Sequence, residues 1–159
     1  MKNLLFIFLL VLLGSCGNDD DTSKNPIDQL PPATQTGENT FGFLVNGKPV
    51  SITNSSKMTA IYQGGLLQFG GGGVFMLVPE PFTINTQNNL TGKARYLVDP
   101  NPELGCHYEF ENTYEGTVTF TKIDTENFII SGTFEFSTVT EDCEDVKITN
   151  GRFDMWYIP

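Results

Sequence analysis

Alternation of apolar and polar side chains is the feature that most constrains the fold of this chain. Val118 and Phe120 stand between threonines, and a similar alternation continues around Gly132. The apolar side chains of that second stretch are Phe128, Ile130, Phe134 and Phe136. Since neighbouring side chains of a strand point to opposite faces, both stretches are expected to be half-buried β-strands. No segment after Phe41 keeps a helical period long enough to predict a helix.

Short apolar runs of the same kind recur along the chain between Gly, Asn, Asp and Pro residues. The other expected strands are Phe41–Val45, Pro49–Ile52, Met58–Tyr62, Leu66–Phe69, Val74–Val78, Lys93–Val98, His107–Phe110, Val146–Thr149 and Arg152–Ile158. Turns or bulges are expected at Asn46-Gly47 and Asn150-Gly151, because both residue types tolerate positive φ. The pattern predicts an all-β domain, an antiparallel β-sandwich of about nine to eleven short strands, with a meandering β-barrel as the alternative.

The N-terminal residues have the layout of a lipoprotein signal peptide. Lys2 precedes an unbroken apolar run over residues 4–13, and Gly14 and Ser15 stand directly before Cys16. A run this short is typical of a cleavable signal, because a membrane-spanning helix needs about 20 apolar residues. Residues 13–16, Leu-Gly-Ser-Cys, resemble the bacterial lipobox, which implies a signal peptide at residues 1–15 and lipidation of Cys16. The alternative is an N-terminal anchor helix.

Acidic residues follow the expected lipidation site. Asp19, Asp20 and Asp21 resemble the export signal that carries Bacteroidetes-type lipoproteins to the outer face of the outer membrane. We therefore expect outer-membrane localisation with exposure at the cell surface; the alternatives are the periplasmic face and, for the tract itself, a solvated spacer. The polar, proline-containing residues 16–39 are predicted to form the lipidated cysteine and a tether, and residues 40–159 a single all-β domain.

The charge balance argues against two classes of partner, nucleic acid and anionic lipid surfaces. The chain carries 9 basic and 19 acidic side chains, a formal net charge of −10, and cleavage after residue 15 would remove Lys2 alone among them. An acidic chain without a Lys/Arg stripe is not expected to bind nucleic acid or to adhere electrostatically to anionic lipid. The expected link to the membrane is therefore the lipid anchor.

Two cysteines are left once Cys16 is assigned to the lipid. In an oxidising compartment outside the cytoplasm, an even remainder is expected to pair. The sequence therefore predicts a Cys106–Cys143 disulfide, with two separate buried thiols as the alternative.

Two strings near the ends of the predicted domain are distinctive, QLPPATQTGENTFGFLVNGK at residues 29–48 and ITNGRFD at residues 148–154. Together with GTFEF at residues 132–136, they resemble the opening and closing signatures of an uncharacterised Bacteroidetes lipoprotein family, a domain of unknown function. The resemblance implies a location and no reaction. The chain departs from the family pattern at Phe43, where a cysteine is expected after Thr-Phe-Gly.

The last expected strand carries polar side chains and a tryptophan on one face. Arg152 and Asp154 lie two residues apart, opposite Phe153 and Met155, so the pattern favours an exposed or edge-covering charge pair over a ligand site. Trp156 shares the face of Asp154. The pattern favours its packing under a loop over exposure for sugar stacking.

Histidine, cysteine and glycine residues offer little chemistry. His107 is the only histidine, and beside Cys106 on a strand it would point away from that thiol. The run Gly70-Gly71-Gly72-Gly73 lacks the Lys-Ser/Thr and the helix of a phosphate-binding loop, so a hairpin turn is expected there.

Acidic residues gather in two places. Glu109, Glu111 and Glu115 could supply the carboxylate pair of a glycoside hydrolase, and Glu109 and Glu111 are expected to share a strand face. Exposed solubilising charge is nevertheless favoured in this polar stretch. The second set surrounds Cys143 and lacks the ligand spacing of an EF-hand: Glu141, Asp142, Glu144 and Asp145. No metal site is predicted.

These features predict a lipid-anchored protein without a catalytic residue or a cofactor. The favoured function is a non-catalytic binding or structural module, whose ligand would be a glycan or a protein. The alternative is a secreted carbohydrate hydrolase that uses a pair of the glutamates named above.

Overall fold

The computed structural model describes residues 25–98, 105–141 and 143–159. One sheet contains β1 (Thr40–Val45), β2 (Lys48–Ile52), β6 (Gln87–Asn89), β9 (Thr113–Asp124), β10 (Ile129–Thr138) and β11 (Val146–Trp156). The other contains β3 (Met58–Gln63), β4 (Leu66–Gly71), β5 (Val74–Pro79), β7 (Ala94–Leu97) and β8 (His107–Tyr108). The 3-10 helices are η1 (Pro26–Gln29), η2 (Ser55–Lys57) and η3 (Phe110–Asn112).

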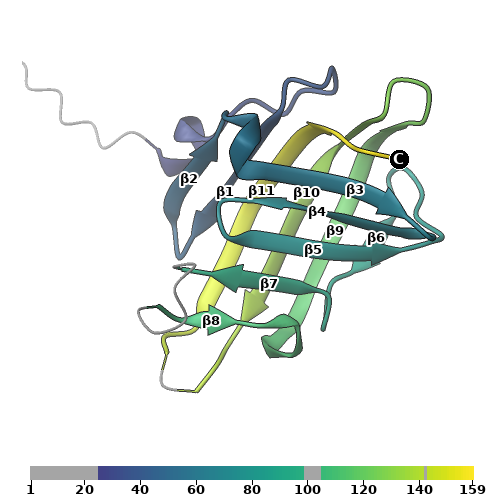
Figure 1. Ribbon diagram of the computed structural model, residues 1–159. Helices are drawn as coiled ribbons and strands as arrows, with labels where there is room; N and C mark the ends of the chain where they lie inside the picture. Colours follow the sequence, from purple (N-terminus) through teal and green to yellow (C-terminus); the bar gives the residue numbers. More distant parts are fainter. Residues whose placement is uncertain (1–24, 99–104, 142) are drawn as a thin grey trace, which may run out of the picture.

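The two sheets lie face to face, and the strands of one cross those of the other steeply (Figure 1). The strand orders are β2-β1-β11-β10-β9-β6 and β3-β4-β5-β7-β8, and all pairs of named strands are antiparallel. The predicted antiparallel β-sandwich is confirmed. The alternative barrel is wrong, because the described strands form two separate sheets.

Most of the predicted strands exist. The predicted strand His107–Phe110 ends at Tyr108, because Phe110 begins η3, and there are three further differences. Two predicted strands form the single strand β11, and Asn150-Gly151 is a bulge within it, with Asn150 at a φ of 52°. The sequence pattern does not predict strand β6, because its sequence, Gln-Asn-Asn, has no apolar residue. Phe128 lies before β10 at a φ of 55° and is 41% exposed, so it does not share the buried face of the strand that follows.

The first strand of the domain pairs with the last. Strands β9, β10 and β11 follow one another as hairpins, and β1 then adds to the free edge of β11. This closing pair could not be assigned by sequential pairing. It brings the opening signature, which contains β1, beside the closing signature in β11.

The core between the sheets is built largely from phenylalanine rings. Phe134 and Phe136 are 3% and 2% exposed, which confirms the predicted buried face of β10. The ring centroid of Phe134 lies 5.0 Å from that of Phe41, and the ring of Phe153 lies 4.8 Å from that of Phe69 on the opposite sheet. Aromatic pairs in such contact stabilise a core beyond their buried area.

The Cys106–Cys143 disulfide is confirmed, with the two Cα atoms 6.1 Å apart. Cys106 directly precedes β8 of the five-stranded sheet, and Cys143 lies in the connection between β10 and β11 of the other sheet. The bond therefore joins the two layers. On the loop-entropy account, closing a loop of 37 residues stabilises the fold by roughly 3–4 kcal/mol.

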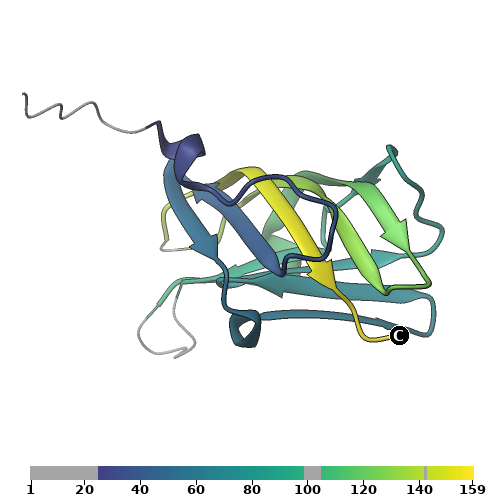
Figure 2. The same ribbon diagram turned by 90° about the horizontal axis from the view of Figure 1, so that it is seen from above.

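Residues 30–39, here called the strap, differ from the flexible tether that the sequence predicts for residues 16–39. The strap crosses the outer face of the six-stranded sheet over β1 and β11 before it turns back into β1 (Figure 2). Leu30 and Pro31 are buried. Gly42 makes this possible, because a Cβ at that position would collide with the ring of Pro31. The part of the tether before residue 25 lies outside the described residues.

Candidate functional site

The strap is fastened to the sheet around one buried carboxylate, that of Asp154, which is 0% exposed. Backbone N–H groups of Thr36, Gly37 and Glu38 donate to it at 2.9–3.1 Å. The hydroxyl of Thr34 in the strap donates at 2.7 Å. Ser131 of β10 also donates at 2.7 Å, from beneath the strap, to the same carboxylate. We call these residues, Thr34, Thr36, Gly37, Glu38, Ser131 and Asp154, the Asp154 latch.

The donors of the latch keep Asp154 ionised. Burial alone would raise the pKa of this carboxyl, but hydrogen bonds from Thr34, Glu38, Ser131 and Gly37 outweigh burial and hold the pKa below its usual value. A buried charge of this kind is tolerated because each oxygen accepts more than one hydrogen bond.

The predicted exposed charge pair of Arg152 and Asp154 is wrong. Asp154 is covered by the strap, and its partners are hydroxyls and backbone amides. Arg152 is half-buried and donates at 3.5 Å to the carbonyl of Ile27. A second contact holds the strap farther across the sheet, where Lys122 of β9 donates to the carbonyl of Gln35 at 3.0 Å. Both cations therefore fasten the N-terminal segment.

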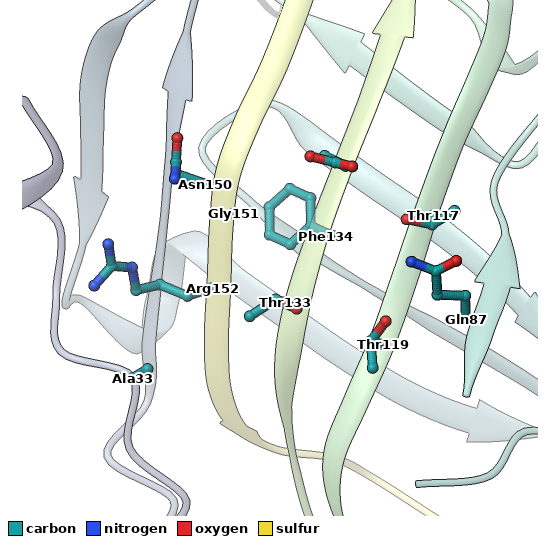
Figure 3. A pocket seen from close by; sticks show the side chains of 10 residues that line it. Ala33, Gln87, Thr117, Thr119, Thr133, Phe134, Asn150, Gly151 and Arg152 are labelled. Carbon is teal, nitrogen blue, oxygen red and sulfur yellow. The ribbon is translucent and has the colours of Figure 1, made fainter. Parts of the chain in front are cut away.

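Beyond the strap, the outer face of β9, β10 and β11 is open and forms a groove. Register places its side chains in rows across the strands. Arg152, Thr133, Thr119 and Gln87 form one row, and Glu135, Thr117 and Asn89 form the next. Figure 3 shows Thr133 between Arg152 on one side and Thr119 and Gln87 on the other. We call this surface the outer groove.

The outer groove consists of two adjoining hollows of about 390 and 420 Å³, which share Thr117 and Glu135. Ala33 of the strap lines one side of the first hollow, and Gln87 of β6 lines the other (Figure 3). Glu115 and Lys147 lie in the second hollow. The surface of the whole outer groove therefore offers hydroxyl groups, amide groups and charged groups of both signs.

Two phenylalanines line the outer groove, but both belong to the core below it. A Cβ on Gly151 would lie 2.7 Å from the Phe134 ring, so the glycine leaves room for that ring beneath the floor. Phe136 is 2% exposed. The groove thus presents polar side chains on a floor supported by aromatic packing.

The glutamates singled out from the sequence are not brought together on one strand. Glu109 precedes the helix η3 and Glu111 lies within it, so the predicted shared strand face is wrong. Glu109 forms an ion pair with Arg95 at 3.6 Å. Glu115 lies on β9 at the edge of the outer groove, where its cross-strand neighbour is Ser137. Glu135, which the sequence did not single out, is the other carboxylate of the groove.

The histidine, the cysteine beside it and the glycine run that the sequence offered as candidate site residues have structural roles. His107 pairs with Leu97 in the sheet, and Cys106 beside it is oxidised, so no thiol is available for a Cys-His dyad. The first two glycines of the run are the last residues of β4, and the chain turns at Gly72 and Gly73, so the predicted hairpin turn is confirmed. Within the described ranges, no group of three or more His, Cys, Asp or Glu side chains could hold a metal ion; Asp142 lies outside them.

Trp156 is 62% exposed, so the predicted packing of its ring under a loop is wrong. One edge of its indole rests against Gly37, where a Cβ would collide with it. Its backbone N–H donates to the side chain of Asn39 at 3.2 Å. The ring therefore borders the strap on the side away from the outer groove.

Cys16, Asp19, Asp20 and Asp21 lie outside the described residues. In the part of the chain that the structure describes, no helix has the length and apolar character needed to cross a membrane.

Comparison with known proteins gave no relative. No family model, curated protein or solved structure matches the chain.

Proposed function

We propose that this protein is a lipid-anchored, non-catalytic binding module of the outer membrane, exposed at the cell surface, and that its outer groove holds a neutral glycan. The observation that carries the proposal is the outer groove, a concave polar surface on a rigid sheet. Its rows of threonine, glutamine and asparagine side chains can both donate to and accept from sugar hydroxyls.

Charge favours a neutral ligand. The groove holds Glu115 and Glu135 beside Lys147 and Arg152, so its own charges balance, and the chain as a whole has a formal net charge of −10. A polyanionic glycan would be repelled by this field, whereas a neutral one would not. The groove also lacks a large exposed apolar side chain among its described lining residues, so an apolar ligand would leave polar groups unpaired.

The membrane part of the proposal rests on the lipobox-like residues before Cys16 and on the acidic tract after it. From Cys16 to Asn25 the chain advances nine residues, which span at most about 30 Å when fully extended. Because the strap packs on the sheet, a lipid on Cys16 would keep the domain close to the membrane. The resemblance to the Bacteroidetes lipoprotein family remains part of this proposal.

Binding to an array of neutral oligosaccharides tests the groove. Thr133→Arg would place a long side chain on the groove floor, since Thr133 is exposed between Arg152 and Thr119. We expect this variant to lose at least about tenfold in affinity. Thr59→Arg on β3 is the matched control and should bind as the wild type does. Equal binding by both variants, or no retained neutral glycan, would contradict the proposal.

The alternative, a carbohydrate hydrolase, is favoured by one observation. Glu115 and Glu135 lie on neighbouring strands, two residues out of register, on the same face. Diagonal neighbours of this kind lie roughly 7–8 Å apart, with their Cβ atoms somewhat closer, and the two carboxyl groups of an inverting glycosidase are roughly 6.5–9.5 Å apart. Both are exposed, however, and a general acid needs a desolvated carboxyl. Release of reducing sugar that Glu135→Gln abolishes would establish the hydrolase.

A further inference from the structure

A second candidate site is lined by Tyr157, close to the C-terminus, and shares no lining residue with the outer groove. Figure 1 shows the C-terminus at one end of the sandwich. The site is a pocket of about 110 Å³ between the two sheets, here called the end pocket. Three aromatic rings line it, from Tyr62, Phe82 and Tyr157, with Leu67 and Ile130 buried beside them. The carboxylate of Glu80 also lines it.

The three rings come from different segments and are held at steep angles. The ring of Tyr62 lies 6.2 Å from that of Phe82 at 88°, and 6.5 Å from that of Tyr157 at 83°. Rings arranged in this way present faces from more than one direction. They resemble the walls of an aromatic cage, the arrangement that recognises quaternary ammonium groups.

Backbone hydrogen bonds hold the segments that carry Tyr62 and Tyr157, and ring packing holds Phe82, without a ligand. The N–H of Tyr62 donates to the carbonyl of Ile158 at 2.7 Å, and the N–H of Tyr157 donates to that of Phe128 at 2.8 Å. The ring of Phe82 packs on that of Phe120 with centroids 5.5 Å apart. A site that is already ordered does not lose this conformational freedom on binding.

The charged group among the described lining residues of the end pocket is an anion, Glu80, and Thr125 adds a neutral hydroxyl. The Tyr62 hydroxyl donates to Glu80 Oε1 at 2.7 Å, and the N–H of Glu80 donates to the carbonyl of Gly65 at 2.9 Å. The hydrogen bond to Glu80, with smaller effects of burial and nearby charge, raises the pKa of Tyr62, so the phenol is neutral at pH 7. No basic side chain occurs among the described lining residues.

Size and charge together select the ligand class. A dry cavity of about 150 Å³ accommodates benzene, so 110 Å³ suits a compact group such as trimethylammonium. Ring faces and a carboxylate both attract a cation, and the net charge of −10 raises its local concentration. We propose that the end pocket binds a small alkylammonium cation.

Calorimetric titration of the full chain with choline chloride, in an uncharged maltoside detergent at fixed sodium chloride, tests the proposal. The matched probe is 3,3-dimethylbutan-1-ol, which has the shape of choline without its charge. We expect saturable choline binding that is about five- to thirtyfold tighter than binding of the neutral alcohol. Equal affinities, tighter binding of the alcohol, or no saturable choline binding would overturn the proposal.

Variants separate the two sources of attraction. Glu80→Gln keeps the shape of an exposed side chain and should weaken choline binding several-fold without changing that of the alcohol. Phe82→Leu keeps an apolar wall and should also weaken choline binding. Trp156→Leu is the control, because this exposed aromatic does not line the end pocket. If choline binds equally to Glu80→Gln, Phe82→Leu and the wild type, the site is elsewhere and the proposal fails. None of these results bears on the outer groove.

Discussion

The outer face of the six-stranded sheet is covered at one end and open at the other. In the covered part, the strap buries the side chain of Asp154, whereas in the open part Thr133 and Glu135 reach solvent. All three side chains point outward from neighbouring strands of one sheet. Their different burial is therefore decided by a segment outside the sheet, and the limit of the strap defines where the outer groove begins.

The two parts also differ in how polar groups are satisfied. Inside a sheet, backbone N–H groups are committed to neighbouring strands, so a buried carboxylate must find its donors elsewhere. The turn at Thr36, Gly37 and Glu38 supplies three free N–H groups, with Gly37 at a φ of 80°. In the open part, solvent or a ligand can supply the hydrogen-bond partners that the polar side chains need.

The largest expected effect comes from the layer that supports the floor of the outer groove. Phe134→Ala would remove a ring that contacts Phe41, Phe43 and Phe153 and leave a cavity. We expect a loss of about 3–5 kcal/mol in the free energy of unfolding, measured by urea denaturation. A loss under about 1 kcal/mol would mean that the core does not depend on this ring.

A smaller loss is expected in the covered part. Asp154→Ala would leave three strap N–H groups and two hydroxyls without their acceptor, at a cost of about 3 kcal/mol. Urea denaturation measures the cost, and limited proteolysis should then cut the strap, residues 30–39. Asp28→Ala, at an exposed aspartate of η1, is the control and should change neither result. An intact strap in Asp154→Ala would refute the latch.

The latch also predicts a pH dependence. Because the pKa of Asp154 is lowered by folding, the unfolded chain takes up this proton first as the pH falls. Stability from the latch is fully present above the ordinary Asp pKa of about 3.9 and is lost as the pH falls below it toward the folded value.

Comparison with Asp154→Asn isolates that contribution. Asp124 titrates in the same region, because the backbone and side chain of Asn127 hold its pKa at about 2, and it is unchanged in the variant. The free energy of unfolding of Asp154→Asn should therefore fall less steeply with acid than that of the wild type. Parallel pH profiles would show that Asp154 does not titrate with folding.

The smallest effect is expected on the open floor. Thr133→Val removes a hydroxyl that faces solvent and keeps the β-branched shape, so the free energy of unfolding should change by no more than about 0.5 kcal/mol. Thermal or urea denaturation measures this change. A loss above about 1 kcal/mol would show that side chains of the open part contribute to the free energy of unfolding as those of the covered part do, and would contradict the distinction between the two parts.

Local patterns predicted the strands well, and they failed where a contact came from far along the chain. The alternation at Phe134 and Phe136 identified the buried face of β10, and the cysteine count identified the disulfide. The pattern of β11 places Asp154 on the correct face but predicts its exposure, because nothing in its strand reveals a covering strap. An aspartate between Phe153 and Met155, together with the Gly- and Thr-containing turn upstream, is the signal that could have found the latch.

The candidate sites also depend on contacts between distant segments, which local patterns do not predict. The threonines of β9 were predicted to share a face, but their alignment with Arg152 and Gln87 depends on a register that includes the bulge at Asn150 and the unpredicted strand β6. Likewise, Tyr62 and Tyr157 are far apart in the sequence and meet only at the end of the sandwich.

The sequence by itself determined the strand-forming segments other than β6, the apolar face of each main strand, and the pairing of Cys106 with Cys143. These depend on side-chain period and on composition, which are local or countable. Tertiary structure alone decided that β1 closes against β11, that residues 30–39 cover Asp154 and leave Thr133 open, and where the rings of the end pocket meet. Such outcomes depend on which distant segments supply donors and shape to one another, since a buried charge is stable only where enough donors converge and a pocket exists only where packing leaves space.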